Sequence, residues 1–177
     1  HLAYGINETA LSIYTNEPSN CKLARNDTSY SFMENEFLCS LSLDPIYKFY
    51  KCDTLLNNLT FGLNKFYFKC KDKANNENTE SYEFNLHGTN PLEITSVEPL
   101  GEIFYNSPIL KLSTSIGAES GKSTCRFSET SSIFENMITF FKTNSSIHEQ
   151  QLKDLTTGSY MYYIICRDTA GNEANSN

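Results

Sequence analysis

The chain contains one sequence pattern twice, and this repeat limits its possible folds more than any other feature. Residues 56–77 align with residues 152–173 without a gap, at an offset of 96. Upstream, the motif around Cys21 matches the motif around Cys125 at an offset of 104. Two homologous structural units follow, and the first repeat holds eight more residues between its shared cysteines than the second.

Each repeat consists of short segments typical of β strands. They are rich in Tyr, Phe, Ile and Thr, are separated by Gly, Asn, Asp and Pro clusters, and show no helical periodicity. We therefore expect an all-β chain with two tandem sandwich domains, residues 1–89 and 90–177. The strands expected in the first repeat are 10–15, 20–24, 55–59, 64–71 and 81–87. Those expected in the second repeat are 92–97, 108–114, 123–127, 137–142, 146–152 and 159–167.

The second repeat also carries motifs of a known family. The run Leu155-x-x-Gly158-x-Tyr160 and the later turn 168–172 resemble the E-to-F corner and F-to-G turn of bacterial and archaeal immunoglobulin-like surface repeats. In the first repeat, Asn64 replaces the corner tyrosine. The resemblance implies two immunoglobulin-like β-sandwiches and says little about a ligand. Antibody-type domains are a poor match, because the chain has no tryptophan.

In this fold the shared cysteines fall on the neighbouring C and F strands of one sheet. With the repeat alignment, the expected disulfides are Cys21–Cys70, Cys125–Cys166 and the remaining pair Cys39–Cys52. Disulfides are favoured over metal ligation because no C-x-x-C pair is present, and they imply an oxidising compartment. Secretion also agrees with four N-glycosylation sequons, at Asn7, Asn26, Asn58 and Asn144.

The extra residues of the first repeat lie around Cys39 and Cys52. They read as a disulfide-closed β-hairpin that turns at Asp44-Pro45. Two interpretations remain open: a contact element that projects from the domain, or a cover for an edge of the sandwich.

The two repeats differ at their last strand. In the first repeat, residues 81–87 alternate between apolar and polar side chains after the turn, whereas the second repeat ends about where this strand would begin. We therefore expect the second domain to lack its own last strand. Tyr160, Tyr162 and Ile164 would then line an apolar acceptor groove beside an unpaired edge.

The start of the chain offers a strand that would fit this vacancy. Leu2, Tyr4 and Ile6 alternate with smaller or polar residues. We expect residues 1–7 to be a donor strand that enters the second domain of the next subunit, giving a head-to-tail homopolymer. Chaperone–usher pilins and archaeal surface threads assemble by a similar route. The alternative is a fragment boundary, with residues 1–8 serving as the first strand of their own domain.

A further difference concerns the other face of the expected strand 159–167. Met161, Tyr163 and Ile165 stand where the first repeat has Lys65, Tyr67 and Lys69. This apolar face is either covered by a neighbour or consists of tolerated surface hydrophobic residues.

Several classes of function are disfavoured. The net charge of −7, without a basic stripe, argues against nucleic acid and anionic membranes. No run of eighteen apolar residues occurs, and no common catalytic, metal or cofactor motif appears, so we expect no enzyme and no cofactor. Residues 168–173 could suggest calcium, but a turn with Gly171 at positive φ is favoured.

The sequence therefore favours a structural subunit of an extracellular filament. The main alternative is an adhesin or glycan-binding module of a larger cell-surface protein, since eleven tyrosines could form a sugar-binding platform. Most of these tyrosines occupy alternating strand positions, which favours a core role. An accessory domain of a secreted enzyme is a third possibility.

Overall fold

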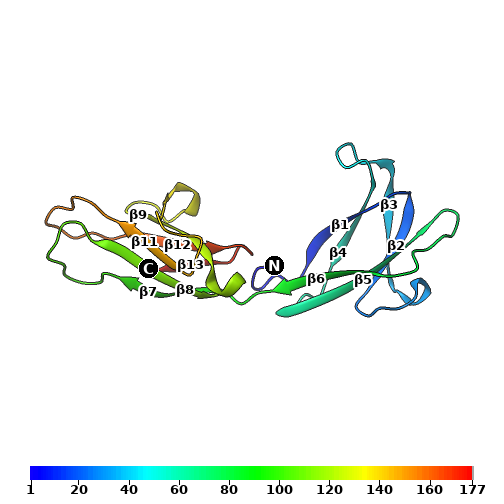
Figure 1. The fold of residues 1–177 in the computed structure, drawn as a ribbon, viewed down its shortest axis with the longest axis horizontal. Helices are drawn as coiled ribbons and strands as arrows, with labels where there is room; N and C mark the ends of the chain where they lie inside the picture. Colours follow the sequence, from blue (N-terminus) through cyan, green and yellow to red (C-terminus); the bar gives the residue numbers. More distant parts are fainter. Residues whose placement is uncertain (177) are drawn as a thin grey trace. The chain divides into compact units, whose positions relative to one another are not determined.

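The computed structural model describes residues 1–176, which form two compact units (Figure 1). The N-terminal unit is Gly5–Gly88. The C-terminal unit combines His1–Tyr4 with the chain from Thr89 onward. The first four residues thus belong to the unit built by the second repeat, whereas the sequence groups them with the first domain.

Both units are made of antiparallel strands and short 3-10 turns. The N-terminal unit contains β1 (Thr9–Thr15), β2 (Ser19–Ala24), η1 (Tyr30–Phe32), β3 (Asn35–Leu43), β4 (Tyr50–Leu56), β5 (Gly62–Asp72) and β6 (Tyr82–Gly88). The C-terminal unit contains β7 (Leu92–Glu98), β8 (Ile109–Ile116), η2 (Ala118–Gly121), β9 (Ser123–Ser128), η3 (Phe134–Asn136), β10 (Ile138–Thr139), β11 (Ile147–Gln151), β12 (Tyr163–Asp168) and β13 (Glu173–Ser176). No helix within residues 1–176 is long and apolar enough to cross a lipid bilayer.

The C-terminal unit is an immunoglobulin-like sandwich of two sheets. One sheet has the order β11-β8-β7 and the other β10-β9-β12-β13. The side chains between them form the core, which includes Leu110, Leu112, Phe127, Phe140 and Ile164. Alternation along the strands produces this core, because every second residue of β8 and β9 points inward.

The N-terminal unit has the strand order β1-β4-β3-β2-β5-β6, with β1 and β6 at the two edges. Its central strand β3 pairs with β2 through its first residues and with β4 from Cys39 onward. The hairpin expected as an insertion is therefore part of the sheet: β4 begins at Tyr50 and pairs with β1 over seven residues. The sequence did not reveal this because β4 was expected only from residue 55.

Three disulfides join neighbouring strands. They are Cys21–Cys70, Cys39–Cys52 and Cys125–Cys166, the pairs that the repeat alignment predicts. In each unit the shared cysteines face each other directly in the ladder, Cys21 opposite Cys70 and Cys125 opposite Cys166. Such bonds indicate an oxidising environment.

Strand β12 is shorter than expected, and a short last strand follows it. β12 begins at Tyr163, whereas a strand was expected from residue 159. After the turn, β13 pairs with four residues of β12, so the second repeat does contain the beginning of a last strand. Asn172 donates two hydrogen bonds to the Asp168 carboxylate, and these close the turn. Glu173 then lies opposite Arg167, so the pairing of β13 with β12 begins directly after the turn. In the first repeat, β6 pairs with seven residues of β5.

The turn and the corner that carry the family resemblance are both formed. Gly171 has φ +91°, as expected for the turn interpretation. At the corner, the Tyr160 hydroxyl donates to the Thr156 carbonyl at 3.1 Å and accepts from the Thr156 amide at 3.0 Å. Asn64 forms the matching pair of bonds with Thr60, at 2.8 and 3.0 Å. An asparagine therefore replaces the corner tyrosine with the same backbone partners.

A buried histidine makes the stability of the C-terminal unit dependent on pH. His148 is fully buried, with Nδ1 2.9 Å from Thr143 Oγ1 and Nε2 3.1 Å from Thr114 Oγ1. It lies beside Cys125 and Cys166, whose sulfur atoms are bonded to each other and so offer no thiolate to a metal. Burial lowers the pKa of His148 from 6.5 to about 4.

Because the native pKa lies below the unfolded value, only the unfolded chain gains the proton between these two values. The free energy of unfolding should therefore be highest above pH 6.5 and fall by about 2 kcal/mol at pH 5. Urea unfolding at pH 7.5, 6 and 5 measures this loss. In the His148→Gln variant, the part of this pH dependence that is due to the imidazole should disappear. An unchanged pH dependence in that variant would assign the effect to other groups.

Candidate strand-binding groove

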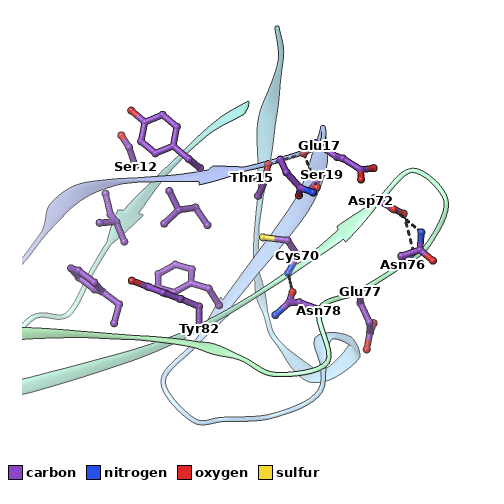
Figure 2. A pocket seen from close by; sticks show the side chains of 16 residues that line it. Ser12, Thr15, Glu17, Ser19, Cys70, Asp72, Asn76, Glu77, Asn78 and Tyr82 are labelled. Carbon is purple, nitrogen blue, oxygen red and sulfur yellow. Dashed lines mark hydrogen bonds between the residues drawn. The ribbon is translucent and has the colours of Figure 1, made fainter. Parts of the chain in front are cut away.

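An open groove runs along the N-terminal unit between its two edge strands. Its cavity volume is about 760 Å³. Figure 2 shows Ser12 and Thr15 of β1 on one side and Tyr82 of β6 on the other. The apolar part of the lining comprises Leu11, Ile13, Phe68, Tyr82 and Phe84.

The C-terminal unit shows which element occupies the corresponding position. Ile13 lies opposite Cys52, and Leu112 lies opposite His148, which occupies the position of Cys52 in the second repeat. Strand β1 is therefore the counterpart of β8. The other edge of β8 pairs with β7. Strand β7 also contacts β13, the short last strand of the C-terminal unit, which corresponds to β6 of the N-terminal unit.

In the N-terminal unit, no strand within residues 1–176 takes this position. β1 is an edge strand, so one side of its backbone lacks ladder partners in that range. The burial of equivalent side chains reflects the difference: Leu110 and Leu112 are 5% and 1% exposed, whereas Leu11 and Ile13 are only half-buried. Unpaired edges beside apolar side chains are ready sites for strand addition.

One end of the groove is polar and acidic. Asp72 accepts hydrogen bonds from the backbone and side chain of Asn76, at 2.8 and 2.7 Å, and these bonds lower the pKa of Asp72. Glu17 and Glu77 line the same cavity. A bound strand with a basic residue at this end would be favoured by charge.

The chemistry of the lining fits binding better than catalysis. Thr15 Oγ1 and Ser19 Oγ both donate to the Glu17 carbonyl, and Ser12 Oγ donates to Asp53. The described lining residues include no histidine or lysine that could activate a hydroxyl. What the groove offers is an apolar floor and an open backbone edge.

The sequence predicted an acceptor in the other unit. There, Ile164 is a core residue, Tyr162 packs against the core, and the Tyr160 hydroxyl is used in the corner. Residues 159–162 lie outside any strand, so this part of the edge has no ladder partner within residues 1–176. Donation to this edge concerns more than one molecule and stays a prediction.

The expected donor segment is a loop in the single molecule. Leu2 is buried in the C-terminal unit, whereas the Tyr4 and Ile6 side chains are 62% and 47% exposed. Gly5 has φ +78°, which turns the chain and interrupts the alternation. Whether these residues rearrange into a strand in an assembly stays a prediction.

The apolar face of β12 is covered from within its own unit. Ile165 is buried with Phe134 and Met137, and Tyr163 packs against the same cluster. Ile165 is therefore not a surface residue, because the segment around η3 folds over it; contact of Met161 or Tyr163 with a neighbouring molecule stays a prediction. Met161, which precedes β12, is 67% exposed.

Two other predicted features are exposed. The tip between β3 and β4 presents large apolar side chains to solvent: Leu41, Leu43, Ile46, Tyr47 and Phe49. The four sequon asparagines, Asn7, Asn26, Asn58 and Asn144, are also exposed.

Sequence reasoning missed the groove of the N-terminal unit, although a signal was present. The first repeat has no strand before β1 within residues 1–176, whereas β7 precedes β8 in the second repeat. The alternation of residues 1–7 instead predicts a donor strand for the second domain.

No family model matches the sequence, and no curated protein matches it. Among solved structures, fibronectin(III)-like modules of CbhA from Clostridium thermocellum align with a TM-score of 0.48 and 8% identity, over 99% of this chain and 84% of that chain. The mouse coronavirus receptor-binding domain complexed with its murine receptor gives a TM-score of 0.45 and 14% identity, over 99% of this chain and 92% of that chain. At these scores neither structure indicates a partner for this chain.

Proposed function

We propose that the chain is a structural module of an extracellular filament, in which a β strand from an adjoining molecule completes the sheet of the N-terminal unit. One observation carries the proposal: the groove beside β1 corresponds to the position that β7 occupies beside β8. The same fold is thus closed in one unit and open in the other. Strand addition supplies main-chain hydrogen bonds and buries alternate side chains.

The incoming strand should resemble β7 in pattern. In the C-terminal unit, Ile94 and Val97 of β7 pack against the core cluster. Similar side chains would cover Leu11 and Ile13 and contact Phe84 across the groove. Each fully buried aliphatic side chain contributes about 1.5–3 kcal/mol, and the new ladder along β1 adds to this.

A peptide with the sequence of Leu92–Glu98 tests the proposal. We expect the peptide to bind the full chain, which fluorescence anisotropy measures. We also expect it to block assembly, which electron microscopy can show. A control peptide with serine in place of Ile94 and Val97 should bind at least about tenfold more weakly, because two aliphatic contacts are lost. The Ile13→Lys variant should lose binding of the matched peptide. If both peptides bind equally, or neither binds, the groove does not accept a strand.

Deletion of residues 1–7 tests which segment donates. If these residues are the donor, the shortened chain should fail to assemble while still binding the Leu92–Glu98 peptide. Unchanged fibres would assign the donor role to another segment of the adjoining molecule. Uniform fibres from purified protein support a structural role, whereas dispersed molecules contradict it.

A second candidate function is a binding module of a larger cell-surface protein. The apolar tip between β3 and β4 favours it, since Ile46 and Leu41 are 78% and 75% exposed. Under this alternative, dispersed molecules should bind cells or glycans, and Ile46→Ser should weaken that binding. Fibre formation that is unaffected by Ile46→Ser would favour the first function.

A further inference from the structure

Two loops of the chain are anchored by the same hydrogen bond. The Leu59 amide donates to the Asn7 carbonyl at 2.9 Å, and the Leu155 amide donates to the Asn106 carbonyl at 2.9 Å. Leu59 and Leu155 are equivalent positions of the repeat. The segment that leads into β1 is therefore the structural counterpart of residues 99–106, which lead into β8.

His1–Tyr4, at the start of the first of these loops, belong to the C-terminal unit and are held within it by three hydrogen bonds. The Leu2 carbonyl accepts hydrogen bonds from the Thr89 amide at 3.0 Å and from Thr89 Oγ1 at 2.8 Å. The Tyr4 amide donates to Asn172 Oδ1 at 2.6 Å. The Leu2 side chain is buried at this contact, with 8% of its surface exposed. Asn172, on the turn between β12 and β13, is thus the acceptor for an incoming loop.

The N-terminal unit carries the same turn. Asn76 is clasped by Asp72, with bonds of 2.8 and 2.7 Å, just as Asn172 is clasped by Asp168, with bonds of 2.9 and 2.8 Å. Asn172 Oδ1 receives the loop amide, whereas Asn76 Oδ1 receives no hydrogen bond within residues 1–176. Asn76 is also exposed beside the groove. This turn is therefore one half of the contact, without its loop.

Residues 99–105 are the equivalent loop of the second repeat, and no turn within residues 1–176 binds their backbone in this way. Phe104, Leu100 and Tyr105 are 94%, 81% and 60% exposed. They border a cavity of about 720 Å³. Three large apolar side chains on one short loop mark an interaction surface. By the alignment that the anchoring bonds define, Ile103 is the counterpart of Tyr4.

We propose that residues 99–105 of one molecule dock on the turn Asp72–Asn76 of a second molecule, with the Ile103 amide donating to Asn76 Oδ1. Phe104 and Leu100, which lie near Ile103 on the loop, become buried at this contact. The contact joins different surfaces, so it is head-to-tail and repeats along a chain of molecules.

This inference goes beyond strand insertion and specifies a separate contact. The groove lies between β1 and β6 and shares Asp72 and Asn76 with this contact at one end, whereas residues 99–105 belong to the other unit and do not line the groove. A failure of one can therefore be distinguished from a failure of the other with the Leu92–Glu98 peptide, which reports on the groove alone.

Two variants divide the contact into its halves. Phe104→Ser removes the loop anchor at a fully exposed position, and Asn76→Ala removes the acceptor. By sedimentation velocity, each variant alone should self-associate at least about tenfold more weakly than the parent. Phe104→Ser, which lies outside the groove lining, should still bind the Leu92–Glu98 peptide normally. Phe141→Ser is the matched control, because Phe141 is 92% exposed in the same unit but lies outside the loop.

Mixing the variants gives the decisive result. Asn76→Ala retains an intact loop and Phe104→Ser retains an intact turn. With the groove blocked by excess Leu92–Glu98 peptide, an equimolar mixture should therefore form discrete one-to-one pairs and no longer species. Self-association of Phe104→Ser at the parental strength would overturn the proposal. So would a mixture that forms no pairs although the parent associates, or a Phe141→Ser control that is weakened equally.

Discussion

Replacing Cys125 and Cys166 together by alanine should lower the free energy of unfolding of the C-terminal unit by about 4 kcal/mol. The disulfide closes a loop of 41 residues, and the chain-entropy model assigns about 4 kcal/mol to a loop of that length. A small domain is stable by only about 5–15 kcal/mol, so this loss is a large share of the total.

Packing adds to the expected loss. Both cysteines are fully buried within the core that contains Leu112, Phe127 and Ile164. The alanine pair removes two sulfur atoms from this core and leaves a cavity, which costs further free energy. The loss should therefore not be smaller than the entropic value alone.

The Cys39–Cys52 disulfide provides the matched comparison. It closes a loop of only 13 residues, for which the same model gives about 3 kcal/mol. Urea unfolding of the two double-alanine variants measures the difference, with tyrosine fluorescence as the signal. An equal or larger loss for Cys39–Cys52 would contradict the loop-length argument and indicate that local packing dominates.

The cysteine pairs could be predicted because the repeat places equivalent residues on neighbouring strands. Cys166 lies 96 residues after Cys70, and Cys125 lies 104 residues after Cys21, so each cysteine of the first repeat has an equivalent in the second. A common fold then implies a common pairing. The groove could not be predicted in the same way. Its walls come from β1 and β6, which lie about 70 residues apart along the chain. Only the structure shows that β1 and β6 line one open groove.

Local patterns also failed where side chains from a loop decide burial. The alternation of Met161, Tyr163 and Ile165 predicts an apolar outer face. Nothing in the sequence of the loop before β10 indicates that Phe134 packs on Ile165. Similarly, residues 1–7 have the alternation of a strand. Gly5 at positive φ and the anchor from Leu59 to Asn7 make them a loop instead.

The corner residue of the N-terminal unit should be as sensitive as a core residue. Asn64→Ala should lower the free energy of unfolding by about 3 kcal/mol. Asn64 is 2% exposed, and its side chain binds the Thr60 amide and carbonyl together with the carbonyls of Gly62 and Leu86. Alanine removes this buried side chain and its bonds to the backbone groups, and a buried group left unsatisfied costs about 1–3 kcal/mol.

The equivalent change in the other unit is the control. Tyr160→Phe removes the hydroxyl that binds the amide and carbonyl of Thr156, but Tyr160 is 42% exposed, so water can replace the lost partner. The expected loss is about 1 kcal/mol or less. Both variants can be followed by urea unfolding at pH 7.5, where His148 is neutral in both states.

Asn64→Tyr separates two explanations of the corner. If the motif alone mattered, tyrosine should restore the bonds that the second repeat makes. Residue 64 lies in a closed site, whereas Tyr160 lies in a partly open one, so the larger side chain should be destabilising despite matching the family pattern. Stability equal to the parent would show that the corner adapts to either residue. A lower free energy of unfolding would show that the corner of the first repeat fits only a short side chain, which also donates to the Leu86 carbonyl of the neighbouring strand.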